Sequence, residues 1–165
     1  MTAAWVLDFG SGLRAAVGEQ HQVHLAYQPQ DVFELPLTPR HARHAILWND
    51  MCVPVLDLGA WLTQGSASTE QHTLGVYWVP GRPGDSMRFG ALWLAKPPQR
   101  RLVDDSMAAD LPAMPQRWAQ ISCSCFTDAA GAVPVLDLAL VFAEPSGQPA
   151  VAVAQHSVVA LAEPA

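Results

Sequence analysis

The sequence predicts a mainly β protein built from two similar halves. The 165 residues include 14 prolines and 11 glycines, which divide the chain into short segments. Short alternating or apolar runs recur between these turn residues, and few windows keep a 3.6-residue period beyond two turns, as is typical of all-β barrels and sandwiches. The hexapeptide VPVLDL occurs at residues 53–58 and again, 80 positions later, at residues 133–138. The length suits one domain, or two small halves that share a core.

The first half contains five predicted strands. The first two flank Gly18-Glu19-Gln20 and are expected to form a hairpin, and the third ends at Pro36. The last two flank Asn49-Asp50, residue types that suit a tight hairpin turn. These strands are 13–17, 23–27, 31–35, 45–48 and 51–55.

The second half contains four predicted strands, 73–79, 87–94, 118–126 and 132–136. The segment PGRPGDS between the first two is the plainest hairpin signal in the chain, and TDAAG separates the last two. Residues 96–117 carry acidic and proline residues and are predicted to form an irregular connection. The polar residues 64–71 are predicted to be a loop within the domain.

Each VPVLDL copy places an aspartate between a strand and a short helical segment. After Asp57, apolar residues follow at i, i+3 and i+4, and the same spacing follows Asp137. An aspartate at this position caps free backbone N–H groups of the helix and interacts with its positive end, worth about 1 kcal/mol. The sequence therefore predicts that Asp57 and Asp137 are structural N-caps.

A catalytic alternative uses the same two aspartates. One carboxylate from each half is the arrangement of aspartic proteases, in which two close carboxylates share a proton. In this chain each aspartate is followed by leucine, which offers no hydroxyl group to orient the carboxylate. The structural interpretation is therefore preferred, with no catalytic residue, and an aspartic-protease-like enzyme is kept as the alternative.

No metal or cofactor site is predicted. The pairs His21-x-x-His24 and His41-x-x-His44 have metal-ligand spacing, but no cysteine or carboxylate pattern joins them. Cys123 and Cys125 are expected to be small residues that face the core rather than a redox pair. Glycine-rich phosphate loops and the Gly-x-Ser-x-Gly motif are absent from the sequence.

Charge and composition favour a protein that binds other proteins. The net charge is −6, which disfavours nucleic acid as a partner. Only 15% of the residues are charged, so we expect some apolar surface to be kept for partners. Most of the six tryptophans should lie in the core, and a few exposed ones would anchor a partner. The sequence shows neither a secretory signal nor a membrane span, so a cytoplasmic location without membrane insertion is expected.

The motifs together resemble the CheW family, the coupling proteins of bacterial chemosensory arrays. VGEQHQVHLAYQPQDVFELP resembles the family's opening hairpin and its V-x-E-[IL] strand end. ILWNDMCVPVLDLGAWL resembles the family's [IV]-P-[IV]-[IVL]-D-L stretch, and TLGVYWV and RFGALWL resemble the strand pair that follows. The resemblance implies a CheW-like domain over residues 13–145, with an N-terminal extension, 1–12, and a C-terminal tail, 146–165.

The resemblance implies two small five-stranded, SH3-like β-barrels on a shared hydrophobic core, without catalysis or cofactors. Family members hold the regulatory domain of the histidine kinase CheA against the cytoplasmic tips of chemoreceptors. By matching position, Val32 and Glu34 are expected in the receptor-facing patch, together with Leu74. A small-barrel binding module for another ligand remains a further alternative.

One departure from the family pattern concerns the first hairpin turn. The family carries Arg-Gly there, and the arginine contributes to partner binding, whereas this chain carries Asn49-Asp50. The contact is therefore expected either to be rebuilt with a basic partner or to be lost. The aromatic-rich strands and Trp118 resemble divergent members that serve type IV pilus systems.

Overall fold

The computed structural model describes residues 1–65, 73–81, 84 and 88–143. Eleven strands and three short α-helices lie in these ranges, with 3-10 turns at Glu19–His21, Arg40–Ala42 and Asp105–Met107. The strands are β1 (Thr2–Asp8), β2 (Arg14–Gly18), β3 (Gln22–Tyr27), β4 (Val32–Glu34), β5 (His44–Trp48), β6 (Met51–Leu56), β7 (Thr73–Val79), β8 (Arg88–Leu94), β9 (Lys96–Val103), β10 (Ser122–Asp128) and β11 (Gly131–Leu136). The helices are α1 (Leu58–Thr63), α2 (Trp118–Ile121) and α3 (Leu138–Ala143).

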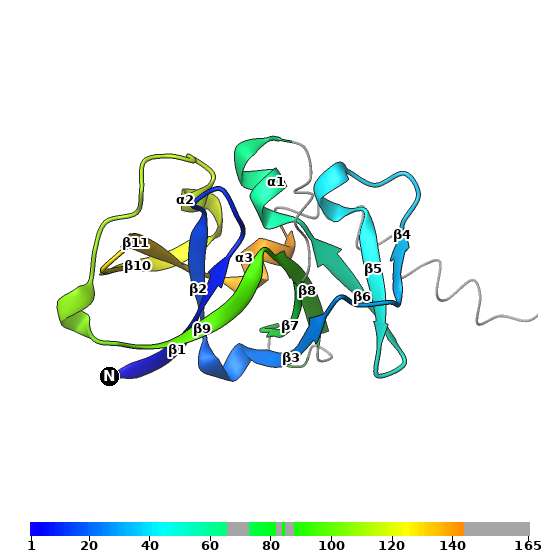
Figure 1. The fold of residues 1–165 in the computed structure, drawn as a ribbon, viewed down its shortest axis with the longest axis horizontal. Helices are drawn as coiled ribbons and strands as arrows, with labels where there is room; N and C mark the ends of the chain where they lie inside the picture. The colour runs from blue at the N-terminus through cyan, green and yellow to red at the C-terminus, as the bar shows by residue number, and fades with distance from the viewer. Residues whose placement is uncertain (66–72, 82–83, 85–87, 144–165) are drawn as a thin grey trace, which may run out of the picture.

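The strands form two sheets that lie side by side, one in each lobe of the molecule (Figure 1). The five-stranded sheet has the order β10-β11-β2-β1-β9, and the six-stranded sheet has the order β3-β7-β8-β6-β5-β4. The pairs β11–β2 and β6–β8 are parallel, and the other named pairs are antiparallel. The prediction of a mainly β protein with two sheet units is confirmed, and β4 adds a sixth strand to one of them.

The chain runs through one series of elements twice, and each sheet takes strands from both passes. The first pass comprises β1 to β6 and α1, and the second comprises β7 to β11 and α3. Strands β1 and β2 pair with β9 and β11 of the second pass, whereas β7 and β8 pair with β3 and β6 of the first. In the first pass, Ile46 of β5 pairs with Val32 of β4. Phe126, 80 positions after Ile46, forms a single bridge with Ala108 in the other sheet. The two passes are therefore intertwined, and neither completes a sheet from its own strands.

The repeated hexapeptide occupies the same place in both passes. Its first four residues end β6 in one copy and β11 in the other, and its aspartate precedes α1 or α3. The Asp57 backbone N–H donates to His41 O, and the Asp137 backbone N–H donates to Ile121 O, both at 2.8 Å. The two acceptor residues, His41 and Ile121, are also 80 positions apart. The backbone hydrogen bond that each aspartate makes is therefore repeated along with the hexapeptide.

Both aspartate side chains adopt the capping geometry that the sequence predicted. Asp57 Oδ1 accepts a hydrogen bond from Ala60 N at 3.0 Å, and Asp57 is 6% exposed. Asp137 Oδ1 accepts from Ala139 N at 3.1 Å and from Leu140 N at 3.4 Å, and Asp137 is half-buried. Each carboxylate therefore satisfies N–H groups of its own helix.

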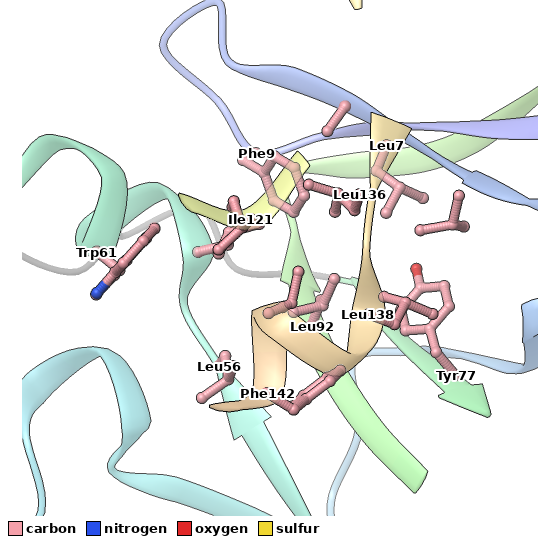
Figure 2. Packing of buried hydrophobic residues seen from close by; sticks show 14 of the residues in the cluster. Leu7, Phe9, Leu56, Trp61, Tyr77, Leu92, Ile121, Leu136, Leu138 and Phe142 are labelled. Carbon is pink, nitrogen blue, oxygen red and sulfur yellow. The ribbon is translucent and has the colours of Figure 1, made fainter. Parts of the chain in front are cut away.

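A shared hydrophobic core joins the two sheets (Figure 2). It takes residues from both sheets and from all three helices. A core shared by the two halves was expected from the sequence. A second cluster lies within the six-stranded sheet, around Val76 and Ala91, and a third lies within the five-stranded sheet, around Val6 and Ala16. Each sheet therefore has a core of its own on one face and contributes its other face to the shared core. Labelled members of the shared core are Leu7, Phe9, Leu56, Trp61, Tyr77, Leu92, Ile121, Leu136, Leu138 and Phe142.

Local hairpin signals were reliable where the paired strands are adjacent in both sequence and space. Strands β5 and β6 pair around Asn49-Asp50, whose φ values of 48° and 60° are those of a type I′ turn. Strands β7 and β8 also pair as predicted. Most of the PGRPGDS turn between them lies outside the described residues, as do residues 66–72 and the tail 146–165.

The predicted hairpin of residues 13–27 is wrong. The two strands exist as β2 and β3, but β2 pairs with β1 and β11, whereas β3 pairs with β7. The 3-10 turn between them carries the chain from one sheet to the other. The segment 1–12, predicted as an extension, contains β1, which lies between β2 and β9 in the five-stranded sheet.

The predicted irregular connection at residues 96–117 is also corrected, because its first eight residues form β9. Strand β9 lies at an edge of its sheet, where prolines and charged side chains are tolerated since one row of backbone groups has no neighbour. The strand predicted at 118–126 begins instead as α2 and becomes β10 at Ser122. Among the described residues, no helix is long and apolar enough to cross a membrane.

Candidate partner-binding surface

The outer edge of the six-stranded sheet carries most of the residues that the sequence predicted as partner contacts. Strand β4 is the edge strand and pairs with β5, which continues into the β5–β6 hairpin (Figure 1). Glu34 is exposed and lies opposite His44. Val32 lies opposite Ile46 and is half-buried against the core cluster within this sheet. Of these two residues, Glu34 is the one that offers its side chain to a partner.

The hairpin tip next to this edge is exposed and firmly supported. Asn49 and Asp50 are both exposed. The preceding Trp48 is half-buried, with its ring 5.0 Å from the Phe89 ring and 6.1 Å from the His24 ring between centroids. These ring contacts hold the end of β5, and the two-residue turn that follows places Asp50 at an exposed tip.

The edge carries the carboxylates of Glu34 and Asp50 and, beside His44, the guanidinium of Arg43. Burial lowers the pKa of His44 and Arg43 lowers it further, whereas the Glu34 and Asp57 carboxylates partly oppose this effect. His44 is therefore neutral near pH 7, since its ordinary pKa is already about 6.5. It does not cancel the charge of Glu34 at that pH. Asp50 carries a second carboxylate at the hairpin tip, at the opposite end of β5 from Glu34. The edge suits a partner surface that carries lysine or arginine.

Leu74 does not belong to this surface. Its side chain is fully buried in the cluster within the six-stranded sheet, and it pairs with Trp93 of β8. The prediction placed it at the start of a strand but could not tell that both faces of β7 are covered. In this conformation Leu74 stabilises the core and is not available to a partner.

Sequence reasoning missed Phe33, which is 45% exposed. It lies between Val32 and Glu34 in β4, so its side chain points to the opposite face of the sheet from theirs. Its neighbour on that face, Leu47 of β5, is 56% exposed. The sequence did contain a signal for Phe33. Side chains alternate between the two faces of a strand, so assigning Val32 and Glu34 to one face places Phe33 on the other.

The tryptophans do not provide exposed anchors. Trp61, Trp93 and Trp118 are buried, and the remaining three are half-buried. One of them, Trp78, stacks on His21 with ring centroids 5.3 Å apart. The exposed large apolar side chains of this edge are instead Phe33 and Leu47.

The candidate catalytic and metal groups occupy structural positions. Asp57 and Asp137 each bind the first turn of their own helix, at the ends of strands in different sheets. Among the described residues, no group of three His, Cys, Asp or Glu side chains could hold a metal ion. Cys125 is buried but Cys123 is exposed, so only one of the two faces the core. The two aspartates therefore support the local fold.

Comparison with known proteins shows the fold. No family model matches the chain, and no curated protein matches it. Among solved structures, the chain is similar to the scaffolding protein TtCheW from Thermoanaerobacter tengcongensis, with a TM-score of 0.67 and 11% sequence identity. The match covers 86% of this chain and 87% of that chain. The architecture described above is therefore that of a known scaffolding protein over nearly its whole length.

Proposed function

We propose that this protein is a non-catalytic adaptor that couples chemoreceptors to a CheA-type histidine kinase in bacterial chemosensory signalling. It binds the regulatory domain of the kinase and the cytoplasmic tip of the receptor, and it acts in the cytoplasm. The observation that carries the proposal is the shared architecture with a scaffolding protein over 86% of the chain. Family motifs in the sequence point to the same role independently of the structure.

The contact chemistry proposed for the adaptor follows from its sheet edge. Glu34, Asn49 and Asp50 are exposed there, and the two carboxylates favour a basic partner surface. Asn49-Asp50 occupies the turn in which the family carries Arg-Gly, so the charge there is reversed. The kinase domain that fits this chain therefore carries lysine or arginine on the surface that contacts Asp50. A partner with an acidic surface there would be rejected by like-charge repulsion.

Charge reversal at the hairpin tip tests this contact. Binding of the kinase regulatory domain from the same genome is measured by calorimetry for wild type, Asp50→Lys and Asp105→Lys. Asp105 is an exposed aspartate in the 3-10 turn after β9, which belongs to the five-stranded sheet, so it provides the same charge change away from the tip. We expect Asp50→Lys to weaken binding and Asp105→Lys to leave it unchanged, with a smaller effect at higher salt because screening grows.

Two outcomes would contradict the proposal at different levels. If Asp50→Lys and wild type bind equally at low salt, the hairpin tip is not part of the kinase contact. If wild type binds neither the kinase domain nor a receptor fragment, the adaptor function itself is wrong and only the fold remains.

The aromatic-rich strands favour a system that drives type IV pili over one that drives flagella. Deletion of the gene in its own host is expected to reduce pilus-based surface motility and to leave swimming intact. Loss of swimming alone would assign the adaptor to a flagellar system.

A further inference from the structure

An apolar patch lies on the face of β4, β5 and β6 opposite Val32 and Glu34. Phe33 pairs with Ala45, Ala45 pairs with Pro54, and Leu47 pairs with Cys52, so these side chains share one face of the sheet. Phe33 and Leu47 are 45% and 56% exposed, and Cys52 and Pro54 are half-buried. We call Phe33, Leu47, Cys52 and Pro54 the apolar patch. Exposed apolar side chains that are contiguous on one face commonly mark a surface that another segment covers.

The last helix ends beside this patch. Strands β6 and β8 pair in parallel with Val55 opposite Ala91, and extending that register by one residue places Pro54 beside Gly90. A Cβ added at Gly90 would collide with the Phe142 ring, so α3 lies on the same face as the patch. From Gly90 to Phe33 is three strand spacings, roughly 14 Å at about 4.8 Å per spacing. The chain therefore leaves α3 at Ala143 over the face that carries the patch.

The residues that follow α3 have a matching composition. Residues 150–161 read AVAVAQHSVVAL, of which nine are alanine, valine or leucine and none is Asp, Glu, Lys or Arg. Ala150 lies seven positions after Ala143, and an extended chain over seven positions spans roughly 23 Å. This exceeds the distance to the far side of the patch. An uncharged, valine-rich segment gains free energy by leaving water, and the patch is an exposed apolar surface within this reach.

We propose that residues 150–161 of this chain dock on the apolar patch and cover Phe33, Leu47, Cys52 and Pro54. The docked segment is intramolecular, so its effective concentration is high and does not depend on protein concentration. Any protein that binds this face of the sheet has to displace it. The inference concerns the chain alone and does not depend on the proposed adaptor role.

Cys52 provides a probe within the patch, and Cys123 provides an internal control. The full-length protein is pulsed with N-ethylmaleimide at one fixed alkaline pH, and the modification of each cysteine is followed by peptide mass spectrometry. Burial raises the pKa of the Cys52 thiol, so little of it is present as the reactive thiolate and its reaction is slow. Exposing Cys52 to solvent should therefore speed its reaction. Cys123 is exposed on β10, in the other sheet.

The test variant is Val151→Asp/Val153→Asp, and the matched control is Ser146→Asp/Gln148→Asp. Both variants add two negative charges to the chain after α3, but only the test variant places them within residues 150–161. Docking predicts that Cys52 reacts roughly tenfold faster in the test variant, because an occluded group reacts in proportion to its uncovered fraction. Cys123 should react at an unchanged rate in both variants, and Cys52 should keep its wild-type rate in the control.

Leu47→Asp should also speed the reaction of Cys52, with little further gain when it is combined with Val151→Asp/Val153→Asp. Equal Cys52 rates in wild type and in the test variant would overturn the proposal. A parallel rise at Cys123 would overturn it as well, because that result means general loosening. A Cys52 rate that falls with rising protein concentration and ignores the tail substitutions would assign the patch to a second copy of the chain.

Discussion

At the scale of single residues, the two repeated aspartates show how one side chain ends a strand and starts a helix. Their positions could be predicted because capping depends on neighbours three or four residues away, which a sequence displays directly. How much each aspartate contributes to the free energy of unfolding could not be predicted in this way. Asp57 is 6% exposed, whereas Asp137 is half-buried. That difference arises from the lobes around them.

Substitution of the capping aspartates should therefore lower stability unequally. We expect Asp57→Ala and Asp137→Ala each to lower the free energy of unfolding by roughly 0.5–2 kcal/mol, with the larger loss at the buried Asp57. Asparagine retains a capping oxygen, so Asp→Asn should cost less than Asp→Ala at both positions. Urea denaturation measures these values, and equal losses for asparagine and alanine would exclude capping as the reason.

A partly buried ion pair adds a pH dependence. Arg14 donates two hydrogen bonds to the Asp128 carboxylate, at 2.8 and 2.9 Å, and this interaction lowers the pKa of Asp128 to about 2. The unfolded value is about 3.9. Because the folded pKa is depressed, the stabilisation is complete above about pH 5 and is lost as the pH falls towards about 2.

The pair can be tested with Asp128→Asn. At neutral pH we expect the variant to be less stable than wild type by about 1–3 kcal/mol. The difference in unfolding free energy should shrink as the pH is lowered from about 5 to about 2. A difference that stays constant across this range would show that the carboxylate charge is not what stabilises the fold.

At the scale of elements, the sequence pattern predicted strands better than it predicted their partners. The β5–β6 hairpin was found because its turn residues and its pairing are local. Strand β9 was missed because Pro97, Pro98 and the arginines after them are unlike a central strand, and only its place at a sheet edge makes them acceptable. At the candidate site, Leu74 was misplaced for a related reason, since both faces of β7 are buried by packing between segments that are distant in the sequence.

Helix α3 depends on a close approach to β8. A side chain at Gly90 would meet the Phe142 ring, so glycine is required for this packing. We expect Gly90→Ala to lower the free energy of unfolding by roughly 1–3 kcal/mol, as overpacked core positions do. In a Phe142→Leu background the same substitution should cost clearly less, which a double-mutant cycle by urea denaturation would show. Additive costs would mean that Gly90 and Phe142 do not constrain each other.

At the scale of the whole molecule, the duplicated chain is intertwined. Strands β1 and β2 complete the sheet of β10 and β11, while β7 and β8 complete the sheet of β3 to β6. The Arg14–Asp128 pair joins the two passes across 114 positions. The repeat was visible in the sequence, but the exchange of strands was not, because it depends on pairings between distant segments that leave no local pattern. The result is a molecule with two lobes that share one hydrophobic core.

The most direct test of the adaptor role is whether the protein bridges its two partners. The kinase regulatory domain, a soluble receptor cytoplasmic fragment and the full-length chain are mixed in pairs and all together, and the species are resolved by sedimentation velocity. The adaptor account predicts a ternary complex when all three are mixed, and no complex between the kinase domain and the receptor fragment when the chain is left out. Binding of neither partner, or binding of one that excludes the other, would contradict it.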